Sequence, residues 1–182
     1  MALKVGIVGM GGIGNTHAKC YMENELAELV AVCDLKAEKA DKAAEDYKVK
    51  AYYNMDDMLA AHPDLDFVDV TTSGYENGSW HYLPAMKAMK AGFNVLVEKP
   101  ISNDVVEARE MVKYAAEHNL YLGCNLNHYF TQTADKAMEY IKEGKIGETV
   151  YILHKVGFNG GDTHHNSNCI TFERIKNFRQ YF

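Results

Sequence analysis

The chain has 182 residues, enough for one large domain or for one domain with part of a second. Hydrophobic residues make up 47% of it and charged residues 24%, which is the ordinary composition of a globular protein. The 19 basic and 25 acidic residues leave a net charge of −6, which argues against nucleic-acid binding, and no apolar run approaches the ~20 residues of a membrane span.

A glycine-rich loop directly follows the first apolar run, residues 3–8, which predicts a short buried strand. The loop has the spacing G-x-G-x-x-G. Its first glycine permits a tight turn, its second lets the backbone approach phosphate oxygens, and its third lets the next helix pack against the sheet. That helix is expected over residues 12–23, with unpaired N–H groups at its start that suit a pyrophosphate. The residues expected to bind a dinucleotide here are Gly9, Gly11, Gly12, Ile13 and Gly14. The alternative is a glycine-rich turn without a ligand.

An acidic residue ends the second apolar run. A strand is expected over residues 29–33, and Asp34 follows it, 34 − 14 = 20 residues after Gly14. A carboxylate at that place accepts hydrogen bonds from the adenosine ribose hydroxyls and repels a 2′-phosphate, so NAD is the expected cofactor. Lys36 lies nearby and softens that repulsion, which leaves NADP as the alternative.

Strands and helices alternate as far as residue 124. Strands are expected over residues 66–70, 94–97 and 121–124. Helices are expected over residues 35–48, 54–61, 80–91 and about 102–118. Asn54 is the expected cap of the second of these helices, and Ser102 or Asn103 that of the last. This alternation predicts an α/β fold, a doubly wound parallel sheet of the Rossmann type, over residues 1–125. The residues that follow strands should then share the ligand-binding edge: Gly9, Asp34, Thr71, Glu98 and Asn125.

The pattern changes after residue 125. A helix is expected over residues 131–143 and a strand over 148–157, followed by a polar stretch at 159–168. We interpret residues 126–182 as the start of a second α+β domain.

Glu98, Lys99 and Pro100 stand where a strand reaches the ligand edge. Pro100 biases Lys99 towards extended geometry. A lysine held there, partly desolvated and close to a nicotinamide, is suited to acid–base work. The alternative is a surface Lys-Pro turn.

Three stretches together resemble one family, the Gfo/Idh/MocA oxidoreductases, over roughly residues 2–156. They are VGIVGMGGIG at the start, HYLPAMKAMKAGFNVLVEKPIS at 81–102 and GKIGE at 144–148. The resemblance implies a dehydrogenase that uses NAD or NADP to oxidise a hydroxyl of a sugar, cyclitol or related polyol. It also implies roles for individual residues: Gly9, Gly11, Gly14 and Asp34 bind the cofactor, Thr71, Thr72 and His81 lie along its path, Glu98 sits near the nicotinamide ribose, and Lys99 is the catalytic lysine.

The chain departs from this family in length and in one motif. Family chains are roughly twice as long, so residues 126–182 are expected to be a truncated fragment of the substrate and oligomerisation domain. The family also places an Asp and, four residues later, a His beside the lysine, whereas Asn166 stands four residues after Asp162. We keep Asp162, His165 and His128 as candidate substrate residues.

No metal site is expected. His154, His164, His165 and Cys169 lack the spacing of a strong metal motif, and a polar loop is favoured over a metal cluster.

No C-x-x-C pair occurs, and Lys4 and the glycine loop interrupt the N-terminal apolar stretch, so we expect a cytoplasmic protein without a signal peptide.

Three hypotheses follow from the sequence. The first is a dehydrogenase for a sugar-like or cyclitol-like polyol, working as a homo-oligomer. The second is a truncated NAD-binding module, without its own catalysis, that serves as a sensor or partner subunit. The third is a fragment of a longer gene product whose last ~20 residues do not belong to the family fold.

Overall fold

The computed structural model describes residues 2–74, 76 and 78–151. The chain divides into two compact units, Met1–Asn125 and Leu126–Phe182. The first unit holds one six-stranded sheet in the order β3-β2-β1-β4-β5-β6, with every pair of neighbours parallel. The strands are β1 (Leu3–Val8), β2 (Ala27–Cys33), β3 (Lys50–Tyr52), β4 (Phe67–Val70), β5 (Asn94–Glu98) and β6 (Leu122–Asn125). This order confirms the predicted doubly wound α/β fold.

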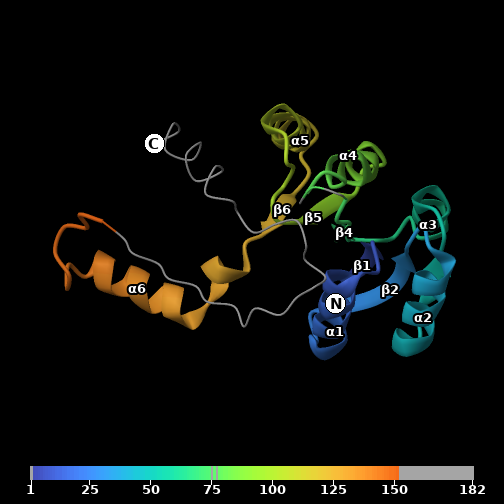
Figure 1. Cartoon of the computed structure of the whole chain (residues 1–182), viewed down its shortest axis with the longest axis horizontal. Coiled ribbons are helices and arrows are strands. Elements are labelled where there is room, and N and C mark those ends of the chain that lie inside the picture. The colour runs from blue at the N-terminus through green and yellow to red at the C-terminus, as the bar shows by residue number, and fades with distance from the viewer. Residues whose placement is uncertain (1, 75, 77, 152–182) are drawn as a thin grey trace. The chain divides into compact units, whose positions relative to one another are not determined.

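Helices cover both faces of this sheet (Figure 1). They are α1 (Gly12–Glu23), α2 (Ala37–Tyr47), α3 (Met55–Ala61), α4 (Tyr82–Lys90) and α5 (Val105–Glu117). Side chains alternate between the faces along each strand. In β1, Val5 and Ile7 are fully buried with residues of α1 and α2, whereas Val8 belongs to the larger core with α3, α4 and α5. The chain therefore forms three layers, with an apolar core on each side of the sheet.

One strand of this unit was missed and one expected helix cap was wrong. Strand β3 was not predicted, because its three residues, Lys50–Tyr52, are too few to show a periodic pattern. Neither Ser102 nor Asn103 is the cap of α5. The cap is Asp104, whose Oδ1 accepts hydrogen bonds from the backbone N–H groups of Val106 and Glu107. A carboxylate is a strong N-cap and also interacts favourably with the helix dipole.

The second unit contains two helical segments among its described residues. A 3₁₀ helix, η1, spans Asn127–Phe130, and helix α6 spans Gln132–Lys142 with Thr131 as its side-chain cap. The helix was predicted. The predicted strand over residues 148–157 does not form in its described part, 148–151, and the remainder lies outside the described residues. A strand needs a hydrogen-bonded neighbour, and the described part of this unit offers none.

Candidate functional site at the carboxyl edge of the sheet

The glycine loop holds α1 unusually close to the sheet. Gly9 has a φ of 102°, and a Cβ there would lie 2.8 Å from the backbone nitrogen of Thr72. A Cβ at Gly14 would clash with the Gly9 carbonyl oxygen and lie 2.8 Å from Thr71 Oγ1. Thr71 Oγ1 donates to the Gly9 carbonyl oxygen at 2.6 Å, which fixes the loop from the side of β4. These contacts place the start of α1 at the carboxyl edge of β1.

The N-terminus of α1 has no side-chain cap, as is also true of α2 and α4. Its N-cap, Gly11, has no side chain to accept a hydrogen bond, and the first turn carries no acidic residue. Helices α3, α5 and α6 each have a capping side chain. A Cβ added at Gly11 or Gly12 would meet no heavy atom within 4 Å, so the space before the helix is open. Free N–H groups, a positive dipole end and open space fit a pyrophosphate group.

Asp34 stands beside this loop and is half-buried. Its Oδ2 accepts the backbone N–H of Met10 at 2.8 Å, and its Oδ1 accepts that of Lys36 at 2.9 Å. Each carboxylate oxygen has two lone pairs, so each oxygen retains acceptor capacity. The two backbone contacts hold the carboxylate at the edge in a fixed orientation, which suits the recognition of ribose hydroxyls.

A cluster of charged and polar side chains lies under the same edge, on the face that α1 covers. Its members are His17 and Tyr21 of α1, Asp69 of β4, Glu98 of β5 and Asn125 of β6. Strand register explains why the last three meet. Asp69 pairs with Leu96, Glu98 stands two residues further along on the same face, and Asn125 pairs with Glu98. The N-terminal half of α1 brings His17 onto this row.

His17 bridges two carboxylates in this cluster. Its Nδ1 lies 2.7 Å from Asp69 Oδ2, and its Nε2 lies 3.1 Å from Glu98 Oε1. The Tyr21 hydroxyl also donates to Asp69 Oδ2, at 2.8 Å. Asn125 Nδ2 donates to Glu98 Oε1 at 2.6 Å and lies 3.0 Å from His17 Nε2. Asp69 is fully buried, and its Oδ1 has no hydrogen-bond partner among the described residues.

Burial and the mutual contacts in this cluster shift the pKa values of its ionisable groups. Desolvation by burial lowers the pKa of His17, but its hydrogen bonds to Asp69 and Glu98 outweigh that effect and raise the pKa to about 10. Burial alone would raise the pKa of Glu98, yet hydrogen bonds from His17, Asn125 and the Lys99 backbone lower it below the usual carboxyl value. Burial and the neighbouring Asp69 raise the pKa of Tyr21 well above its usual value. The favoured state is therefore a phenol, an imidazolium and an ionised Glu98.

The segment Glu98-Lys99-Pro100 is held from both sides. Glu98 Oε2 accepts the backbone N–H of Lys99 at 3.0 Å. His81 Nδ1 lies 2.6 Å from the Pro100 carbonyl oxygen and donates to it, and the His81 side chain is buried. Gly78 packs so closely on Pro100 that a Cβ there would lie 2.7 Å from Pro100 Cγ. The side chain of Lys99 is exposed in the described chain, and its partial desolvation beside a nicotinamide stays a prediction.

Apart from Gly9, Gly14 and Glu98, whose contacts are given above, the residues predicted to bind the cofactor fall into two groups. In the first group, the backbone or the side chain is accessible to a ligand at the carboxyl edge of the sheet; its members are Gly11, Gly12, Ile13, Asp34 and Lys99. Thr71, Thr72 and His81 use their polar side-chain atoms on the protein itself: Thr71 on Gly9, Thr72 on the Trp80 carbonyl oxygen at 2.7 Å, and His81 on Pro100. Their contacts fit a role in shaping the site.

The three candidate substrate residues are not among the side chains described. Asp162 and His165 lie outside the described residues, as do the other members of the histidine-rich stretch considered above. His128 falls in η1, and the position of its side chain is likewise outside what the structure describes.

Sequence reasoning missed His17, Tyr21 and Asp69. One signal was present: Asp69 interrupts the apolar strand Phe67–Val70, and a carboxylate on a buried strand requires partners. His17 and Tyr21 are four residues apart and so share one face of α1. The partners themselves come from residues 48 and 52 positions away, which no local pattern identifies.

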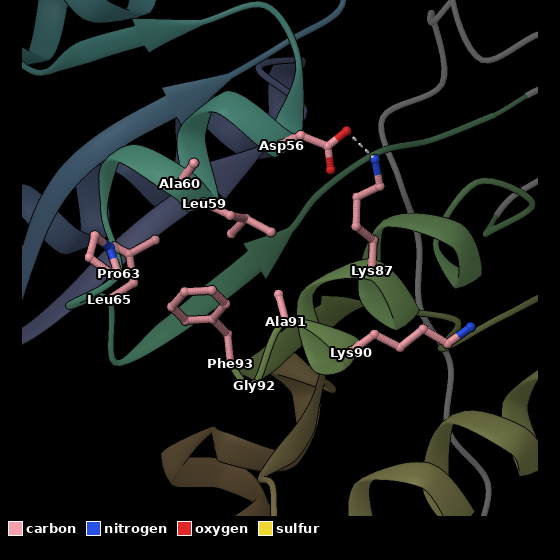
Figure 2. A pocket seen from close by; sticks show the side chains of 10 residues that line it. All are labelled: Asp56, Leu59, Ala60, Pro63, Leu65, Lys87, Lys90, Ala91, Gly92 and Phe93. Atoms are coloured by element: carbon pink, nitrogen blue, oxygen red, sulfur yellow. Dashed lines mark hydrogen bonds and ion pairs between the residues drawn. The ribbon is translucent and has the colours of Figure 1, made fainter.

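A hollow of about 660 Å³ lies at the opposite, amino-terminal edge of the sheet. Figure 2 shows the residues that line it, from α3, α4 and the segments that precede β4 and β5. Its walls are largely apolar, and Lys87 Nζ is paired with Asp56 at 2.8 Å. Ligands of open α/β sheets bind at the carboxyl edge, so this hollow is not the candidate site.

Comparisons with known proteins agree with this geometry. A family model described as "Oxidoreductase family, NAD-binding Rossmann fold", GFO_IDH_MocA, matches residues 3–126. A UDP-N-acetylglucosamine 3-dehydrogenase of Acidithiobacillus ferrooxidans is 29% identical over 82% of this chain and 44% of its own length. A D-glucoside 3-dehydrogenase of Escherichia coli is 30% identical over 87% of this chain and 45% of its own.

Solved structures give the same result. A scyllo-inositol dehydrogenase from Lactobacillus casei, solved with bound NAD(H) and scyllo-inositol, superposes with a TM-score of 0.73 at 27% identity. The match covers 81% of this chain and 43% of that one. The chain thus spans less than half the length of the relatives it matches. Among the described residues, no helix is long and apolar enough to cross a membrane.

The charge state of His17 predicts how stability depends on pH. The pKa of His17 is raised from 6.5 to about 10 on folding, so its contribution is fully present below pH 6.5 and is lost as the pH rises towards 10. Over that window the free energy of unfolding should fall more steeply in the native chain than in His17→Gln, by at most about 1.4 kcal/mol per pH unit. Urea unfolding at a series of pH values measures both slopes. Equal slopes would contradict the raised pKa.

Proposed function

Because the chain belongs to the Gfo/Idh/MocA family of oxidoreductases, we propose that it is the cofactor-binding part of an NAD-dependent dehydrogenase. The reaction is hydride transfer between the nicotinamide and a carbinol carbon of a sugar, cyclitol or related polyol. The family membership confirms the resemblance seen in the sequence. The substrate class is inferred from relatives named for glucosides, UDP-N-acetylglucosamine and inositols.

The uncapped start of α1 is the observation that carries this proposal. The free N–H groups of the first turn, at Gly12, Ile13 and Gly14, are the donors for the pyrophosphate. Gly11 has open space before it, so phosphate oxygens are able to approach the backbone. Asp34, fixed by its two backbone contacts, accepts the ribose hydroxyls and disfavours a 2′-phosphate. We therefore propose NAD as the cofactor, with NADP as the weaker ligand.

Lys99 is the proposed acid–base residue. Its side chain is exposed at the edge of the sheet, and its backbone is held by Glu98. In the oxidative direction the Lys99 amine takes the hydroxyl proton of the substrate, and in the reductive direction it returns that proton. Bound NAD supplies the acceptor for the hydride and its electron pair. Glu98 stays ionised, because its pKa is lowered by hydrogen bonds from His17 and Asn125.

A second candidate is an NAD-binding module without its own turnover, acting as a sensor or partner subunit. The exposure of Lys99 favours it, because acid–base catalysis gains from a site that excludes water. Both candidates share the cofactor site and differ only in whether a polyol is oxidised. In either case residues 126–182 are proposed to belong to the substrate and oligomerisation domain.

We also propose that the chain forms a homo-oligomer in the cytoplasm. Large apolar side chains of the second unit are exposed, among them Leu126, Tyr129, Phe130 and Ile146. Exposed apolar surface favours association. The described cysteines are free thiols, as expected in a reducing compartment.

Light scattering on the purified chain should give a mass of at least two copies, and a clean monomer at micromolar concentration would contradict the oligomer.

A pair of glycine substitutions tests the cofactor site. Gly11→Ala should weaken NAD binding by about tenfold or more, since its methyl group enters the space that phosphate oxygens need, while leaving the unfolding free energy nearly unchanged. Gly14→Ala should destabilise the fold by about 1–3 kcal/mol or more, because its methyl group clashes with backbone. Calorimetric titration with NAD and NADP, together with urea unfolding, separates the two effects. Tighter binding of NADP than of NAD, or full NAD affinity in Gly11→Ala, would contradict the site.

Substitution of the lysine tests turnover. Lys99→Ala should retain NAD binding and lose at least about a hundredfold in kcat, the usual contribution of a positioned acid or base. The assay follows NADH absorbance with a panel of polyols, and Lys90→Ala, on the far edge of the sheet, is the matched control. Equal turnover in native chain and Lys99→Ala would exclude this role. Intact NAD binding without turnover on any polyol would favour the second candidate.

A further inference from the structure

We propose that His17 and Asp69 are positioning residues for Lys99, acting through Glu98. His17 donates from both ring nitrogens and so bridges the carboxylates of Asp69 and Glu98. Glu98, held in this way, accepts the backbone N–H of Lys99 and fixes the direction in which the lysine leaves β5. The inference rests on the proposed function insofar as Lys99 is the residue that exchanges a proton with the substrate.

The contacts of the bridge require a proton on each ring nitrogen of His17, because each nitrogen faces a carboxylate oxygen. Asp69 is fully buried, and Glu98 is nearly so. Two buried carboxylates that share one neighbour need a cation between them, because an uncompensated buried charge is costly. His17 is the one cationic side chain among the described hydrogen-bond partners of these two carboxylates. A neutral imidazole would place a bare ring nitrogen against a carboxylate oxygen, which is a contact of two acceptors.

The remaining contacts of Glu98 fit this arrangement. Asn125 Nδ2 and His17 Nε2 both approach Glu98 Oε1, at 2.6 Å and 3.1 Å. Two donors that converge on one oxygen explain why the two nitrogens lie 3.0 Å apart. Because Oε1 is held twice, the carboxylate cannot rotate freely, and Oε2 stays available to the Lys99 N–H at 3.0 Å. Without His17, Glu98 would be held on Oε1 by Asn125 alone.

Asp69 fixes the imidazolium from the other side. Its Oδ2 accepts hydrogen bonds from His17 Nδ1 and from the Tyr21 hydroxyl. The imidazole ring of His17 is therefore bound to β4 as well as carried by α1. The three groups that face His17 are therefore Asp69, Glu98 and Asn125, with Tyr21 sharing the Asp69 oxygen. The contacts run from the centre of the sheet to the backbone of Lys99, and each link is within hydrogen-bond distance.

Two near-isosteric substitutions separate the two ends of the bridge. The amide nitrogen of Asn occupies nearly the place of imidazole Nδ1, so His17→Asn retains a donor for Asp69 and loses the one for Glu98. The amide nitrogen of Gln matches Nε2, so His17→Gln retains the donor for Glu98 and loses the one for Asp69. His62, whose Nε2 lies 2.9 Å from the Tyr52 hydroxyl and which belongs to neither carboxylate's contacts, takes the same two substitutions as a control.

The measurement is amide hydrogen exchange at Lys99 in the cofactor-free chain, followed by NMR. His17→Asn should speed exchange at Lys99 by about tenfold or more, as expected for a lost hydrogen bond to a charged group. His17→Gln, which loses only the anchor to Asp69, should speed exchange at Lys99 by a smaller factor than His17→Asn, and the His62 variants should leave the protection unchanged. Amide exchange at Val5 and Ile7, which lie in the central strand β1, reports unfolding of the whole unit. If protection at Lys99 is unchanged in His17→Asn, or is lost only in step with Val5 and Ile7, the positioning role is excluded.

A measurement on the native chain covers the case in which His17→Asn does not fold. Nitrogen NMR of the His17 ring at pH 8 should show a proton on both ring nitrogens; a neutral tautomer would overturn the proposal. Neither measurement needs cofactor. A chain that fails to bind NAD would therefore refute the proposed function while leaving the exchange result to decide the role of His17 in placing Lys99.

Discussion

The close approach of α1 to the sheet at Gly14 is the constraint on which the site depends. Only a residue without a side chain fits against the Gly9 carbonyl and Thr71 Oγ1. This one contact does two things. It aims the free N–H groups of the helix at the carboxyl edge, and it brings His17, less than one turn further along, over Asp69 and Glu98. Anion binding above the edge and charge pairing beneath it thus share one geometric cause.

The two parts of the site have different electrostatics. Above the sheet, backbone dipoles and open space suit a negatively charged ligand. Beneath it, two carboxylates surround one imidazolium, and this buried group has its own hydrogen bonds. Buried ionic groups contribute little net stability compared with apolar packing, but they fix geometry because each charge requires its partner. Such a cluster suits a place where a lysine backbone must point in one direction.

Much of the first unit could be predicted because its signals are local. The glycine spacing, the residue at the end of β2 and the alternation of strands and helices gave β1 and α1 with the residues that the structure has. The cap of α5 was misplaced by one or two residues because Ser102, Asn103 and Asp104 are all capable caps, and only the backbone geometry decides between them. Strand β3 was too short for any period to show.

The charged cluster could not be predicted, because its members meet only through tertiary structure. His17 and Asn125 are 108 residues apart, and they come together only when β6 takes its place at the edge of the sheet. Before that strand docks, Glu98 lacks its amide partner. The cluster is therefore complete only when β6 is paired with β5. A nascent chain that has reached only β5 has its glycine loop in sequence but lacks the last hydrogen-bond donor of the cluster, so the Glu98 end of β5 gains its full set of hydrogen bonds only after the sixth strand has emerged.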